Sequence, residues 1–168
     1  HVGMKQLSRR GLLSSGRVLG EGSAFLVLER EEDARARGAR VLGILESVAL
    51  AASSAIDLSE VAPEPIEDAV SRCRGTRSLG AVISSAAGDP RGDAALARAL
   101  GATAPVVSFR AALGDTLAAG PAIDLVLALE ALERRTLPAT PPLNGDPILV
   151  VAAGLSATVG AAVLGAAS

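Results

Sequence analysis

Residues 79–100 read LGAVISSAAGDPRGDAALARAL, and this stretch decides the fold class. The run from Leu79 to Ser84 is apolar without polar alternation, which is typical of a strand covered on both faces. A turn containing glycine and proline follows over 86–92, and Asp93 is a suitable N-cap for a helix over 94–100. Strand, turn and helix in this order predict a unit of the α/β class.

The same alternation of strand and helix extends outward in both directions. Further strands are predicted over residues 24–29, 41–51, 105–108, 148–153 and 158–164. Further helices are predicted over residues 31–37, 66–74 and 117–135. We therefore expect one layered α/β unit, with a mixed, mostly parallel sheet and helices on both of its faces.

The helix predicted over 117–135 is apolar nearly all round its circumference. Asp124, Glu130 and Glu133 interrupt the apolar pattern, and we expect the helix to be buried. Pro121 fits the first turn of this helix, where the missing N–H of proline breaks no helical hydrogen bond.

The composition argues against two classes of partner. Hydrophobic residues make up 49% of the chain, but aromatic residues only 1%, with neither Trp nor Tyr. A chain that has no aromatic platform for bases and carries a net charge of −2 is not expected to bind nucleic acid. The apolar runs over 148–153 and 157–164 are too short to cross a bilayer, so we expect no membrane association.

The single cysteine and single histidine limit the available chemistry. Cys73 alone forms neither an internal disulfide nor a multi-cysteine metal site, so we expect a cytoplasmic protein without metal or cofactor. His1 precedes Met4 and looks like part of a tag remnant. We assign residues 1–17 to this remnant and an irregular basic arm, and residues 18–168 to one domain.

Four segments of the chain resemble the ketosynthases, the condensing enzymes of fatty acid and polyketide synthesis. Residues 18–29, VLGEGSAFLVLE, are close to the family's G-x-V-x-G-E-G-A strand entry. Residues 80–93 are similar to its H-G-T-x-T-x-x-G-D segment, and residues 110–140 to its K-S-x-x-G-H segment with the helix and P-P-T exit that follow. Residues 153–160 resemble its closing F-G-F-G-G-T-N turn. The resemblance implies the C-terminal half of a β-ketoacyl synthase or chain-length-factor-like protein, with a thiolase-like fold.

The resemblance also implies that the reactive positions of the family are substituted. Its two histidines, which hydrogen-bond the thioester carbonyl, fall on Ser85 and Asp115, its lysine falls on Arg110, and Leu155 replaces a phenylalanine of the closing turn. An acid at Asp115 would place negative charge beside a developing oxyanion, the reverse of what catalysis requires. The cysteine nucleophile of the family lies in an N-terminal half, outside this sequence. We therefore expect no catalytic residue here.

Three functional hypotheses follow from the resemblance. The preferred one is a non-catalytic, chain-length-factor-like subunit that pairs with a ketosynthase, or with a protein supplying the N-terminal half, in polyketide or fatty acid biosynthesis; acyl carrier protein is a further candidate partner. The second is an acyltransferase half whose active site a partner chain completes with the cysteine. The third is a structural homodimer with a binding role. The sequence also fits a fragment of a longer protein.

Overall fold

The computed structural model describes residues 19–52, 63–85, 90–101, 104–138, 140–153 and 158–167. One sheet contains five strands, β1 (Ile44–Ala52), β2 (Ala81–Ser84), β3 (Val106–Val107), β4 (Ile148–Ala153) and β5 (Thr158–Gly165), in the spatial order β1-β5-β4-β2-β3. β2 pairs in parallel with β4 and β3, whereas β5 pairs antiparallel with β4 and β1. The predicted mixed sheet is confirmed, although its parallel and antiparallel pairings are equal in number.

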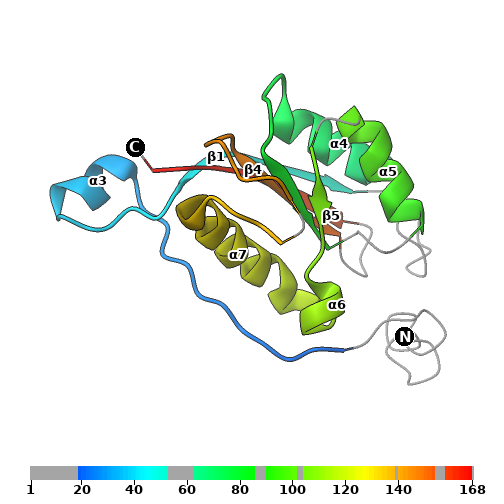
Figure 1. Cartoon of the computed structure of the whole chain (residues 1–168), viewed down its shortest axis with the longest axis horizontal. Coiled ribbons are helices and arrows are strands. Elements are labelled where there is room, and N and C mark those ends of the chain that lie inside the picture. Colours follow the sequence, from blue (N-terminus) through cyan, green and yellow to red (C-terminus); the bar gives the residue numbers. More distant parts are fainter. Residues whose placement is uncertain are drawn as a thin grey trace.

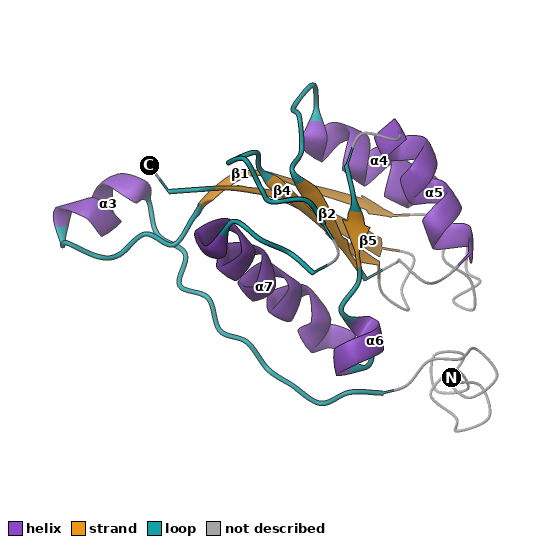
Figure 2. Cartoon of the chain, in the orientation of Figure 1, coloured by secondary structure: helices purple, strands orange, loops and turns teal. Residues whose placement is uncertain are grey.

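Helices cover both faces of the sheet, as predicted (Figures 1 and 2). The helices α4 (Pro63–Arg74) and α5 (Pro90–Leu100) lie on one side, and α7 (Gly120–Arg134) lies on the other. The short helix α6 (Arg110–Leu113) and the 3-10 turn η2 (Leu117–Ala119) lead into α7. The charged helix α3 (Glu31–Ala36) is set apart from the sheet (Figure 1).

Each face of the sheet has its own apolar core. Because successive strand residues point to opposite faces, Val82 of β2 packs with α4 and α5, whereas Ile83 packs with α7. Ile66 of α4 and Ile148 of β4 are both completely buried, on opposite sides of the sheet. Burying a branched aliphatic side chain of this size contributes about 1.5–3 kcal/mol, so the two cores hold the helices to the sheet.

Two helices differ from the sequence expectation at their ends or in their burial. α5 begins at Pro90 rather than after Asp93, because proline is well suited to the first turn of a helix. The long helix begins as η2 and then α7, with Pro121 in its first turn as predicted. Its predicted burial is only partly right, since Val126 is 39% exposed. The arm 1–17 and the turn at Gly154 lie outside the described residues.

The strand predicted over 24–29 is wrong. The segment follows an extended path, but Phe25 is 93% exposed and Val27 is 83% exposed. Within the described part of the chain, residues 21–29 make no backbone hydrogen bond to another residue. A strand forms only where a neighbouring strand satisfies its N–H and C=O groups, and among the described residues no strand lies beside the segment.

In the described part of the chain, no helix is both long and apolar enough to cross a bilayer.

Candidate functional site

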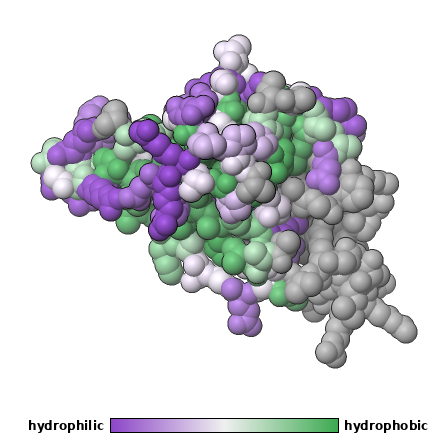
Figure 3. All heavy atoms as spheres, viewed as in Figure 1, coloured by the Kyte–Doolittle hydropathy of each residue, from purple (hydrophilic) through white to green (hydrophobic). Residues whose placement is uncertain are grey.

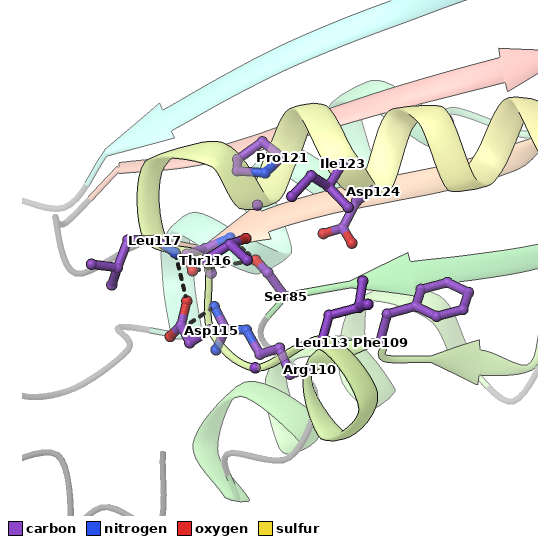
Figure 4. A pocket seen from close by; sticks show the side chains of 13 residues that line it. Ser85, Phe109, Arg110, Leu113, Asp115, Thr116, Leu117, Pro121, Ile123 and Asp124 are labelled. Atoms are coloured by element: carbon purple, nitrogen blue, oxygen red, sulfur yellow. Dashed lines mark hydrogen bonds and ion pairs between the residues drawn. The ribbon is translucent and has the colours of Figure 1, made fainter. Parts of the chain in front are cut away.

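A small pocket lies where the ends of β2 and β4 meet the beginning of α7 (Figure 4). Ser85 follows β2, Ala153 ends β4, and α6 with the loop after it closes the opposite wall. The pocket leaves about 40 Å³ for a water-sized molecule. The carboxyl ends of parallel strands are a common place for functional side chains in α/β sheets, and β2 and β4 form such a pair.

Ser85 is tied to the main chain of β4. Its Oγ accepts a hydrogen bond from the N–H of Ala153 at 2.8 Å. The same hydroxyl lies 3.3 Å from the carbonyl oxygens of both Val151 and Ala153, to which it can donate its one proton. The side chain is buried, and it joins the ends of β2 and β4 rather than pointing freely into the pocket.

Asp115 forms a local hydrogen-bonded turn just before the long helix. Its Oδ1 accepts the N–H of Leu117 at 3.0 Å, and its Oδ2 lies 3.6 Å from Nη2 of Arg110. The backbone of Leu117 lies in the left-handed region, with a φ of 53°, and this hydrogen bond helps to hold it there. The carbonyl of Asp115 also accepts the N–H of Gly20 at 3.1 Å. The carboxylate therefore has two structural contacts within a buried site.

Asp124 is a third charged residue of the pocket, and the sequence analysis did not identify it as a site residue. It lies on α7 with 9% of its surface exposed, and its side chain points toward the pocket (Figure 4). Burial raises the pKa of Asp124 to about 6, an effect that the positive Arg110 opposes and the negative Asp115 reinforces. The available signal is an acid one turn beyond Pro121 in an apolar helix, and by itself this pattern indicates only a break in the apolar face.

The charged groups of this pocket are one cation and two acids. One guanidinium, that of Arg110, faces two carboxylates, so the pocket carries a net negative charge when Asp124 is ionised. A developing oxyanion is stabilised by preorganised donors and destabilised by nearby negative charge. Among the described residues there is no group of three or more His, Cys, Asp or Glu side chains that could hold a metal ion.

Three of the four positions singled out from the sequence come together in this pocket. Ser85, Arg110 and Asp115 all line it, whereas Leu155 lies outside the described residues. Cys73 is elsewhere, on α4 at the opposite face of the sheet, where it is 1% exposed. Its Sγ lies 3.4 Å from Oγ of Ser47 on β1, a contact that fits a packing role.

Comparisons with known proteins agree with the fold and with the sequence segments. Residues 45–144 match the family model of the beta-ketoacyl synthase C-terminal domain. The chain is 31% identical over 153 residues to 3-oxoacyl-[acyl-carrier-protein] synthase 2 of Mycobacterium tuberculosis, a match that covers 79% of this chain and 34% of the relative. It is 33% identical over 147 residues to a polyketide beta-ketoacyl synthase of Streptomyces cyaneus, covering 74% of this chain and 33% of that protein.

Two solved structures share the fold at lower identity. The ishigamide ketosynthase/chain length factor superposes with a TM-score of 0.77 at 22% identity, covering 90% of this chain and 45% of that chain. A ketosynthase from module 6 of the bacillaene synthase of Bacillus subtilis 168 gives 0.75 at 17% identity, covering 96% and 40%. The chain thus spans about a third of the length of these curated relatives.

Proposed function

Because the chain belongs to the beta-ketoacyl synthase family, we propose that it is a non-catalytic, chain-length-factor-like subunit that pairs with a ketosynthase or a ketosynthase half. The observation that carries the proposal is the contact set of Asp115, which accepts the N–H of Leu117 and faces Arg110. The resemblance places a histidine of the family at this position. An acid that is built into the helix start has exchanged a reactive role for a structural one.

The other substituted positions support the same proposal. The hydroxyl of Ser85, at the second histidine position, is engaged with the main chain of β4. A serine in this setting donates at most one neutral hydrogen bond and does not transfer protons near neutral pH. Arg110 keeps the positive charge of the family's lysine, but its guanidinium is shared with Asp115 and lies near Asp124. In this proposal the pocket corresponds to the active site of the family but lacks its two histidine donors.

The relatives support pairing within polyketide or fatty acid synthesis. One of the similar structures is described as a ketosynthase with a chain length factor, and this chain covers less than half of the matching chain. A ketosynthase partner would supply the cysteine nucleophile, and acyl carrier protein would deliver the acyl group to it. In this proposal the protein acts in the cytoplasm and needs neither metal nor cofactor of its own.

The test is reconstitution with a ketosynthase encoded beside this chain. Light scattering measures the mass of the chain alone and of the mixture, and acyl transfer from a labelled acyl thioester measures activity. We expect a heteromeric complex whose activity depends on the cysteine of the partner and is unchanged, within about twofold, by Arg110→Lys or Asp115→Asn.

A loss of about 100-fold or more in these variants, at unchanged complex mass, would favour the acyltransferase-half hypothesis instead, because that loss matches the removal of one group that stabilises the transition state. A stable homodimer that forms no complex with the ketosynthase would favour the structural-dimer hypothesis.

A further inference from the structure

The strand β1 lies at an edge of the sheet. It contains nine residues, Ile44–Ala52, and among the described residues only β5 pairs with it. In an antiparallel pair, alternate residues of an edge strand direct their N–H and C=O groups to its outer side. An outer side of this length is a template to which another strand can add.

The side chains of β1 favour such an addition. Ala49 and Ala51 are buried in the core beneath α4. Val48 and Leu50 alternate with them and point to the opposite face, where they are 58% and 66% exposed. Exposed apolar side chains beside an unpaired main chain are typical of edge strands that associate.

One side chain of α4 covers the main chain of β1. Nη2 of Arg72 donates a hydrogen bond to the carbonyl oxygen of Leu50, and this contact lies at the exposed surface. The guanidinium thus occupies an acceptor that the N–H of an added strand would otherwise use. A strand that docks here must first break a hydrogen bond from a charged donor, which is stronger than one between neutral groups.

The position of Arg72 is fixed by Asp68, one helical turn before it. Nε of Arg72 donates to Oδ1 of Asp68 at 3.0 Å, and Nη2 donates to Oδ2 at 2.8 Å. A bidentate contact of this kind fixes the orientation of the guanidinium plane. One hydrogen of Nη2 is therefore held by Asp68, and the other is directed to the carbonyl of Leu50.

The beginning of β1 is interrupted in a different way. Its register with β5 shifts between Leu45 and Ser47, so Glu46 is an extra residue in the strand. Such a bulge breaks the regular row of main-chain groups. Glu46 also places a charge there, and its Oε2 lies 3.2 Å from Nε of Arg77. Bulges and charged side chains are the usual means by which an edge strand avoids pairing.

We propose that Arg72, oriented by Asp68, prevents a further strand from adding to β1, and that the strand it excludes is β1 of a second copy of this chain. Two copies of β1 can pair antiparallel about a twofold axis, because the same surface then serves on both sides. Val48 and Leu50 of one copy would lie beside those of the other, and their contacts would add to the main-chain hydrogen bonds. The inference goes beyond the pairing proposed above, and its test uses this chain alone.

The test compares Arg72→Ala with Arg98→Ala as the matched control. The two arginine side chains are 53% and 57% exposed, and each pairs with an acid of α4, Asp68 or Glu67. Of the two, Arg72 is the one that donates a hydrogen bond to β1. Apolar residues are also exposed over α7 (Figure 3), so the natural chain is the reference for every comparison.

Light scattering over a range of concentrations measures self-association, and amide hydrogen exchange measures the protection of β1. Arg72→Ala should associate at concentrations at least about 10-fold lower than the natural chain, because no charged hydrogen bond has to be broken first. The amides of β1 should exchange more slowly in the associated form. Arg98→Ala should associate like the natural chain.

Two further variants complete the experiment. Leu50→Lys added to Arg72→Ala should reverse the association, because lysine on an edge strand opposes pairing. If circular dichroism shows that Arg72→Ala does not fold, Asp68→Ala makes the same test, because Arg72 then loses the carboxylate that orients it.

Association of Arg72→Ala or Asp68→Ala no stronger than that of the natural chain overturns the inference. Association without protection of β1, equal association of Arg98→Ala, or its persistence with Leu50→Lys also overturns it. These outcomes leave the pairing with a ketosynthase to the reconstitution experiment described above.

Discussion

Replacing Asp124 with asparagine tests whether burial in the pocket makes the ionised form of this side chain destabilising. The pKa of Asp124 rises from its ordinary 3.8 to about 6, chiefly because burial disfavours the ionised form. A folded carboxyl that holds its proton more tightly than the unfolded one makes its most favourable contribution to stability at low pH. This contribution is lost as the pH rises from about 4 through about 6.

The size of the effect follows from the shift. A rise from 3.8 to about 6 is about 2.2 units, and each unit corresponds to 1.36 kcal/mol, so ionisation of Asp124 costs about 3 kcal/mol of folding free energy at neutral pH. Asparagine has nearly the same shape as the protonated acid and carries no charge. The variant Asp124→Asn should therefore be more stable than the natural chain by up to about 3 kcal/mol at pH 8 and equally stable at pH 3.5.

The assay is urea unfolding between pH 3.5 and pH 8, followed by circular dichroism because the chain has neither Trp nor Tyr for fluorescence. The measured quantity is the difference in unfolding free energy between variant and natural chain, which cancels the titration of all other groups. Glu32→Gln, at an exposed acid on α3, is the control for the loss of one negative charge.

A constant difference across this pH range would refute the reasoning, because it would show that Asp124 has the same affinity for protons in the folded and unfolded states. A variant that is less stable at pH 8 would refute it more strongly. Such a result would mean that the attraction between Asp124 and Arg110 exceeds the penalty of burial, and that the two residues form a stabilising pair.

Four further predictions concern the turn at Asp115, the helix end and the two cores. Asp115→Ala should lower the unfolding free energy by about 1–3 kcal/mol because the N–H of Leu117 loses its acceptor, and Asp115→Asn, which keeps an oxygen acceptor, should cost less in the same urea assay. Arg135 ends α7 with a φ of 54°, so Arg135→Gly should raise stability by about 0.5–1 kcal/mol, visible as a higher melting temperature. Ile83 is completely buried, and Ile83→Ala should cost about 2–5 kcal/mol in chemical denaturation. Cys73 is 1% exposed and should react with a thiol reagent only as fast as the protein unfolds; rapid labelling of native protein would contradict its placement.

Local patterns predicted those elements that this chain can complete by itself. The run from Ile148 to Ala153 is flanked by β2 and β5, and the structure confirms it residue for residue. Gly38 ends the charged helix after Glu31 with a φ of 72°, as a C-terminal glycine should. In each case the signal and the interaction that satisfies it lie within this sequence.

The predictions that were wrong depend on contacts between residues that are distant in the sequence. The segment 24–29 has the composition of a buried strand, but the described part of the chain places no strand beside it, and it is extended and exposed there. Asp124 looked like a break in an apolar helix because only the folded structure brings Arg110 and Asp115 close to it. The start of α5 moved by a few residues because the turn signals of Pro90 and Asp93 overlap, and backbone geometry decides between them.

The pairing of the first and last strands has a consequence for the modularity of this domain. Ile44 at the start of β1 lies directly opposite Gly165 at the end of β5, so the chain enters and leaves the sheet at one point. Domains whose ends are adjacent tolerate being inserted into another chain or permuted, because neither operation has to bridge a long distance. Residues 44–165 should accordingly be transferable as one cassette, with the two junctions side by side, into the corresponding position of a longer ketosynthase.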